Sequence, residues 1–267
     1  MNANKPNRWL AALLALALAT LACGALSGGG GATETPPKPR VPTQTAKAAA
    51  LTAEAEATAT KAPRPTPTPQ LALPSPTPPP GPGDIVYFTD FDDLDDWTKI
   101  FALPETDHYT AEIQQGKLYI QVDDRSTTIY AFHDLDLGQS DVQIDADVET
   151  VAGPNRNNIS LICRATGDGW YEFSMNSGGH WIIWINDDTG IRALKQGDSL
   201  AINLQKAKNH LTVVCQGDTL TLYVNDEEVG SVSDDTFAAG QVGVSVSTFE
   251  IKGAGVEFDN VIVSIPK

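Results

Sequence analysis

Three acidic residues alternate along one short segment and are the first candidates for chemistry. Asp145, Asp147 and Glu149 are separated by Ala146 and Val148. Residues two apart on an extended strand point to the same side, so the three carboxylates are expected on one face. Glycoside hydrolysis uses two carboxyl groups, about 5–5.5 Å apart for retention and about 6.5–9.5 Å apart for inversion. The alternative is a strand with an acidic, solvated face and no catalysis.

A second group of residues combines aromatic rings with hydrogen-bonding side chains. Strand alternation predicts that five side chains share one outward, concave surface: Arg164, Trp170, Glu172, His180 and Trp184. Sugar rings stack on exposed tryptophan faces, while carboxylate and guanidinium groups bond to hydroxyls. The alternative is that Trp170 and Trp184 pack under loops. Trp181 has the opposite parity to Trp184 and is expected in the core.

Two cysteines, Cys163 and Cys215, are the only thiols after residue 83. Each occupies the apolar face of its own predicted strand. An exported chain meets an oxidising compartment, where such a pair forms a disulfide. The other interpretation is two buried free thiols, and no histidine or third cysteine has the spacing of a metal site.

Charge and proline divide the chain into three parts. The first 83 residues hold seven Lys and Arg against three Asp and Glu, whereas the remainder holds 11 against 31, a charge of -20. Fourteen of the 18 prolines lie between Pro36 and Pro82. A body this acidic lacks the basic surface that phosphates need, so nucleic-acid binding is not expected.

The first 22 residues have the order of a secretory signal. Lys5 and Arg8 precede an apolar run from Trp9 to Ala22, which is shorter than the about 20 residues of a membrane-spanning helix. The sequence from Ala19 to Cys23 resembles a bacterial lipobox, with Thr20 where leucine is commonest. The resemblance implies cleavage after Ala22 and lipid attachment to Cys23, so the protein would be extracytoplasmic and held at the membrane, on the cell surface. A plain secretory signal with a chance cysteine is the alternative.

Residues 23–83 are rich in Pro, Thr, Ala and Gly and poor in aromatics. Such a segment cannot bury enough apolar surface to offset the entropy of ordering, so a disordered tether is predicted. A ligand for a proline-binding domain is the alternative.

Residues 84–267 are expected to form one all-β domain. Period-two alternation recurs, as in Leu118, Ile120 and Val122, and turn residues such as Gly178-Gly179 separate the segments. No long helical periodicity is present. About a dozen short strands predict a sandwich.

The second half of this domain also carries family motifs: Asn209-His-Leu211-x-Val213, Gly217-Asp218, Leu222-Tyr223-Val224-Asn225, Asp234-Asp235, Gly240-Gln241-Val242-Gly243 and Phe258-Asp259-Asn260-Val261. They resemble the concanavalin A-like lectin/glucanase superfamily, in its laminin-G-like and family-16-like branches. The resemblance implies a jelly roll of two curved antiparallel sheets, with a concave face that binds glycans in many relatives. Asp226 departs from the motif, because relatives often have glycine after the asparagine.

The resemblance bears on the acidic residues as well. Family-16 glycosidases use a Glu-x-Asp-x-Glu-like strand as nucleophile and acid/base, but Asp145 replaces the first glutamate. Relatives often hold a structural Ca²⁺ where the first and last strands meet, so Asp90 and Asp259 are candidate ligands. A solvated acidic turn is the alternative at Asp90.

The sequence therefore predicts a membrane-tethered surface lipoprotein that displays a non-catalytic, carbohydrate-binding domain. Its charge favours neutral glycans as ligands. A structural or protein-binding ectodomain is the main alternative, and a family-16-like glycoside hydrolase is a further one.

Overall fold

The computed structural model describes residues 78–94, 96, 97, 99–134 and 141–267. The predicted signal peptide, Cys23 and nearly all of the predicted tether lie outside these residues. The described part contains fifteen strands and no helix: β1 (Pro82–Thr89), β2 (Lys99–Leu103), β3 (Tyr109–Gln114), β4 (Lys117–Val122), β5 (Thr128–Phe132), β6 (Val142–Ala152), β7 (Asn158–Ala165), β8 (Trp170–Asn176), β9 (His180–Asp187), β10 (Gly190–Asp198), β11 (Lys208–Gln216), β12 (Thr219–Val224), β13 (Glu227–Ser233), β14 (Gln241–Ser247) and β15 (Ala254–Pro266). It therefore has no helix that could cross a membrane.

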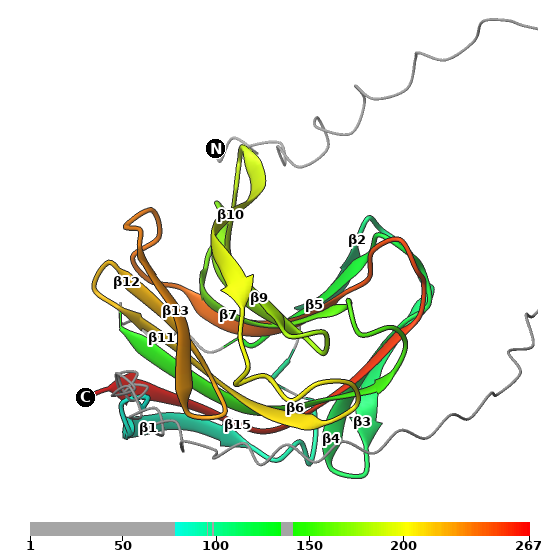
Figure 1. The fold of residues 1–267 in the computed structure, drawn as a ribbon, viewed down its shortest axis with the longest axis horizontal. Helices are drawn as coiled ribbons and strands as arrows, with labels where there is room; N and C mark the ends of the chain where they lie inside the picture. The colour runs from blue at the N-terminus through cyan, green and yellow to red at the C-terminus, as the bar shows by residue number, and fades with distance from the viewer. Residues whose placement is uncertain (1–77, 95, 98, 135–140) are drawn as a thin grey trace, which may run out of the picture. The chain divides into compact units, whose positions relative to one another are not determined.

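The strands form two antiparallel sheets packed face to face (Figure 1). The eight-stranded sheet has the order β13-β12-β11-β6-β15-β4-β3, and β1 pairs with the end of β15. The seven-stranded sheet has the order β10-β9-β8-β7-β14-β5-β2. This second sheet curves like a trough whose outer face is concave, with β10 and β2 as its raised sides (Figure 1). The predicted jelly-roll sandwich is confirmed.

The alternation of apolar and polar residues along the strands places the apolar side chains in the core, as expected. Inward-facing side chains of both sheets form one buried apolar cluster, which includes Leu118, Ile144, Phe173 and Val213. Trp181 is buried in this cluster, as its parity predicts. Each fully buried aliphatic side chain contributes about 1.5–3 kcal/mol relative to exposure, so this cluster is the main source of stability.

The predicted disulfide is present between Cys163 on β7 and Cys215 on β11. It joins the two sheets through the core, where both residues are fully buried. The bond closes a loop with a sequence separation of 52 residues.

The hairpin at Asn225 and Asp226 accommodates the departure from the family motif. Both residues have positive φ, +50° and +67°. These values fit a two-residue turn of the type that follows the right-handed twist of the flanking strands β12 and β13. The turn has the shortest hairpin length, and Asp226 occupies a left-handed conformation that glycine would adopt at lower cost.

Candidate functional site

The outer face of the seven-stranded sheet has a floor of small polar residues. Strand pairing aligns Ser245 on β14 with Ser160 on β7 and Ser174 on β8. The Ser160 and Ser174 hydroxyls are 2.8 Å apart and hydrogen-bonded. Bulky side chains stand on both sides of this floor, with Tyr130 on β5 and Ile182 on β9 in the same cross-strand row.

A cavity of about 700 Å³ opens at one end of this concave face. It lies where β7 begins, β8 ends, β9 begins and β10 ends, because Asn158, Asn176, His180 and Asp198 occupy those positions. Two loops complete the wall: the β6–β7 loop and the β14–β15 loop. The volume is within the about 300–1,000 Å³ range of small-molecule sites.

The turn between β8 and β9 fixes the side chain of Asn176. Its Oδ1 accepts hydrogen bonds from the Gly178 N–H at 3.0 Å and the His180 N–H at 3.3 Å. Gly179 closes the turn with a φ of +96°, a conformation that other residues rarely adopt. Because Oδ1 is held by the backbone, Nδ2 is the atom of Asn176 that can donate to a ligand.

Asn158 provides a free amide at the base of the cavity. The side chain is 4% exposed and lines the cavity, yet it makes no hydrogen bond to any residue in the described part of the chain. Its amide atoms are not among the enclosed side-chain atoms that lack a partner, so they reach the cavity and can bond there. A ligand or water in the cavity is the remaining partner for this amide.

Neighbouring residues extend the polar surface. Asn157 donates from Nδ2 to the Gly253 carbonyl at 3.0 Å, which leaves its Oδ1 as an acceptor. His180 Nδ1 lies 2.9 Å from Oδ1 of Asp198, its cross-strand partner on β10. Arg156 and Glu250 lie at the exposed rim.

Apolar residues form the other part of the lining. Phe249 and Ile251 come from the β14–β15 loop, and both are exposed, Phe249 by 43%. Ile182 and Pro154 contribute aliphatic surface. An exposed ring next to amides and carboxylates is the combination that sugar rings and their hydroxyl groups match.

Of the five residues that the sequence predicts on the concave surface, His180 lines the cavity. Trp184 lies on the same face of β9, two residues beyond Ile182, and is half-buried. Its Nε1 donates to the Ser174 hydroxyl at 3.0 Å, which holds the indole against the floor. Binding by Trp184 stays a prediction, since it does not line the cavity.

The other three residues differ from the expectation. Arg164, Trp170 and Glu172 have the predicted side-chain directions but are only 1%, 7% and 2% exposed. Trp170 packs edge-on against Tyr130 and Phe132, with ring centroids 5.2 and 5.4 Å apart. Side chains from β5 thus cover it, and it presents no open face to a sugar.

Arg164 and Glu172 have structural partners. Arg164 donates to the Phe237 carbonyl at 3.1 Å and lies 3.6 Å from Asp141. Glu172 Oε1 accepts from the Ser245 hydroxyl at 2.6 Å. Burial raises the pKa of Glu172, against the opposing effect of hydrogen bonds from Ser245 and Ser160. Both residues therefore stabilise the sheet beneath the surface instead of facing a ligand.

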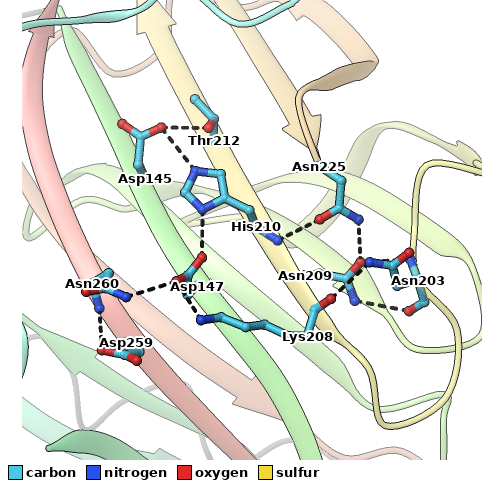
Figure 2. Close-up of polar contacts among 10 residues, drawn as sticks. All are labelled: Asp145, Asp147, Asn203, Lys208, Asn209, His210, Thr212, Asn225, Asp259 and Asn260. Carbon is cyan, nitrogen blue, oxygen red and sulfur yellow. Dashed lines mark hydrogen bonds and ion pairs between the residues drawn. The ribbon is translucent and has the colours of Figure 1, made fainter.

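The carboxylates of Asp145, Asp147 and Glu149 share the outer face of the eight-stranded sheet, as alternation predicts. Figure 2 shows the network that engages the first two. Asp145 accepts from the Thr212 hydroxyl at 2.6 Å. Asp147 lies 2.9 Å from His210 Nδ1 and 2.8 Å from Lys208 Nζ. Neither aspartate nor Glu149 lines the cavity on the other sheet.

This network also shifts the pKa values of its members. The carboxylates of Asp145 and Asp147 raise the pKa of His210 to about 9, although burial opposes the shift. For Asp147, burial acts to raise the pKa, but hydrogen bonds from Lys208, His210 and Asn260 outweigh it and lower the pKa. At neutral pH the imidazolium therefore lies between two carboxylates and holds β11 to β6.

The candidate Ca²⁺ ligands are placed near each other by strand pairing, because Thr89 on β1 is opposite Val261 on β15. Asp90 follows Thr89 directly, and Asp259 precedes Val261 by two residues. In the part of the chain that the structure describes, no three His, Cys, Asp or Glu side chains are grouped as metal ligands would be. Two carboxylates alone do not make the site of six to eight oxygens that Ca²⁺ requires, so Ca²⁺ binding stays a prediction.

Sequence reasoning missed most of the cavity. Asn158 and Asn176 lie at strand ends beside predicted turns, and amide residues there usually signal a turn instead of a ligand site. Phe249 and Ile251 lie in a loop with no alternation. The sequence held one signal: two apolar residues, Phe249 and Ile251, lie in a short loop before the last strand.

The comparisons with known proteins agree with this fold. Residues 148–243 match the family model of the concanavalin A-like lectin/glucanases superfamily, in its laminin-G form. No curated protein matches the chain.

Solved structures with a similar fold are found at low sequence identity. A Bacillus subtilis protein of unknown function with a galectin-like fold is 9% identical, with a TM-score of 0.55 over 70% of this chain and 99% of that one. A structure described as "Prominent members of the human gut microbiota express endo-acting O-glycanases to initiate mucin breakdown" is 8% identical, with a TM-score of 0.51 over 69% and 100%. The carbohydrate-binding module CBM66 of Bacillus subtilis is 17% identical, with a TM-score of 0.49 over 63% of this chain and 97% of that one.

The predicted resemblance to the concanavalin A-like superfamily is thus confirmed for residues 148–243, and the two-sheet fold agrees with it. The cavity lies on the concave face of that fold.

Proposed function

We propose that this protein binds neutral glycans in the cavity at the end of the concave sheet, without catalysis by the domain. The observation that carries the proposal is the Asn158 amide, 4% exposed, lining the cavity and without a hydrogen-bond partner among the described residues. Amide groups pair with sugar hydroxyls as both donor and acceptor. The concanavalin A-like lectin/glucanase family model supports the same ligand class.

The electrostatics of the site favour an uncharged ligand. The chain from residue 84 onward carries a charge of -20, and the cavity lining holds two acidic residues, Asp198 and Glu250, against one basic residue, Arg156. An acidic polysaccharide would meet repulsion that a neutral glycan avoids.

The test replaces Asn158 with leucine, which keeps the size of the side chain and removes both hydrogen-bonding groups. We expect Asn158→Leu to lower the glycan-array signal of the full chain at least tenfold, because the ligand loses its buried amide partner. The matched control is Gln114→Leu, an exposed amide on β3 of the other sheet, which should bind as the wild type does. Equal binding by both variants would refute the cavity as the site.

Attachment to the membrane through a lipid at Cys23 is part of the same proposal and rests on the sequence. Lys5, Arg8 and the apolar run to Ala22 have the order of a lipoprotein signal. We expect Cys23→Ala to release the protein from the membrane fraction of a bacterial host and to abolish incorporation of labelled palmitate. Palmitate labelling that persists in the variant would contradict the assignment. Each buried CH₂ of an acyl chain contributes about 0.8 kcal/mol, so several chains hold firmly.

A further inference from the structure

The cavity lining contains amide side chains and aliphatic side chains close to one another. Ile182 lies on the same face of β9 as His180, and it is paired with Ser174, two residues before Asn176 on β8. Ile182 is therefore a diagonal neighbour of Asn176 within the sheet, and both line the cavity. Phe249 and Ile251 add further apolar surface from the β14–β15 loop. Sugar hydroxyl groups alone do not match this apolar part of the lining.

The hydrogen bonds within the protein determine which amide atoms remain for a ligand. Asn176 uses Oδ1 for the Gly178 and His180 N–H groups, which leaves Nδ2 as a donor. Asn157 uses Nδ2 for the Gly253 carbonyl, which leaves Oδ1 as an acceptor. Asn158 offers both atoms. The cavity thus presents a donor and an acceptor of amide type beside aliphatic carbon.

Resting on the proposed function, we infer that the cavity selects glycans that carry an acetamido group, with N-acetylhexosamines as the ligand class. The acetamido carbonyl accepts from Asn176 Nδ2 or Asn158 Nδ2, and its N–H donates to the Oδ1 of Asn157 or Asn158. Its methyl group packs on Ile182 and Ile251. A hydroxyl in place of the acetamido group leaves the apolar surface uncovered and one amide without a partner, which lowers affinity.

The charge of the wall restricts the class to uncharged members. Asp198 lines the cavity, and Glu250 and Arg156 both lie at its exposed rim, so the lining has two acidic residues against one basic residue. Sialic acids carry an acetamido group and a carboxylate, and the carboxylate would face these two acidic residues. Neutral N-acetylhexosamines carry no such charge.

The experiment compares sugars that differ only in this group. The full chain is applied to an array of neutral glycans printed as matched pairs, with N-acetylglucosamine against glucose and N-acetylgalactosamine against galactose as the terminal ring. Chitotriose against cellotriose is then measured by titration calorimetry. We expect binding at least tenfold stronger for the acetamido member of the bound pairs.

The variant Asn176→Asp tests the mechanism of this preference. A carboxylate still accepts the two backbone N–H groups of the turn, so the local fold is kept, but it offers no donor to the acetamido carbonyl. We expect the ratio of affinities for the acetamido and hydroxyl members of a pair to fall at least fivefold. If the variant unfolds, binding of the matched glycan pairs by the wild-type protein still tests whether the acetamido group is preferred.

The outcomes separate the two proposals. Equal or stronger binding of the hydroxyl members overturns the inference and leaves neutral-glycan binding in place. Absence of binding to every glycan on the array overturns both.

Discussion

At the residue scale, His210 is the group whose environment most directly predicts a dependence on pH. It lies between Asp145 and Asp147, and its pKa is raised to about 9 from an unfolded value of about 6.5. A raised pKa means that the folded state binds this proton more tightly than the unfolded state. The stabilisation is fully present below the unfolded pKa and is lost as pH rises through the folded pKa.

We therefore expect the urea midpoint of the wild type to fall between pH 6 and pH 9.5 by more than that of His210→Gln. The substitution removes the titrating group and keeps a polar side chain next to Asp147. Measurements at pH 6, 7.5 and 9.5 suffice for both proteins. Parallel midpoints across this range would show that the imidazolium does not contribute.

At the element scale, Trp181 links the sheet edges through two glycines. Its ring lies against Gly197 on β10 and Gly230 on β13, so that a Cβ at Gly230 would meet Trp181 Cη2 at 2.2 Å. Trp181 adjoins His180, which lines the cavity. Close packing by glycine therefore positions the end of β9 that forms the site.

We expect Gly230→Ala to lower the free energy of unfolding by about 1–3 kcal/mol, because the methyl group overpacks the core beside Trp181. Gly167→Ala is the matched control, since a Cβ there meets nothing within 4 Å. Chemical denaturation of the two variants makes the comparison. Equal stability of Gly230→Ala and the wild type would mean that the tryptophan moves aside at no cost.

Elements were predictable from the sequence where one face is buried. Strands β4, β6 and β11 show clear alternation, and the parity of Cys163 and Cys215 predicts their disulfide. Strand β10 was not predicted, because nearly all of its residues are exposed and it has no apolar stripe. Strand β5 was also missed, although strands β7 and β8, which are likewise buried on both faces, were predicted.

At the scale of the whole molecule, the sequence predicts the sandwich and the concave face but not the position of the site. Alternation gives the direction of a side chain, whereas exposure depends on residues distant in the sequence. Trp170 points outward and is nevertheless covered by Tyr130 and Phe132 of β5. The cavity likewise needs the β6–β7 and β14–β15 loops together, and no local pattern shows that they meet.

The most direct test of the site observes the asparagine side chains themselves. In the full chain with asparagine labelled in its side-chain amide, a neutral glycan chosen by its array signal is titrated and the amide resonances are followed by NMR. We expect the Asn158 and Asn176 resonances to shift together and to saturate with one Kd. The amide of Asn260 serves as the control, since it donates to Asp147 within the eight-stranded sheet and should stay unchanged (Figure 2). Glycan binding that leaves the Asn158 and Asn176 resonances unshifted would contradict the assignment of the cavity as the glycan site.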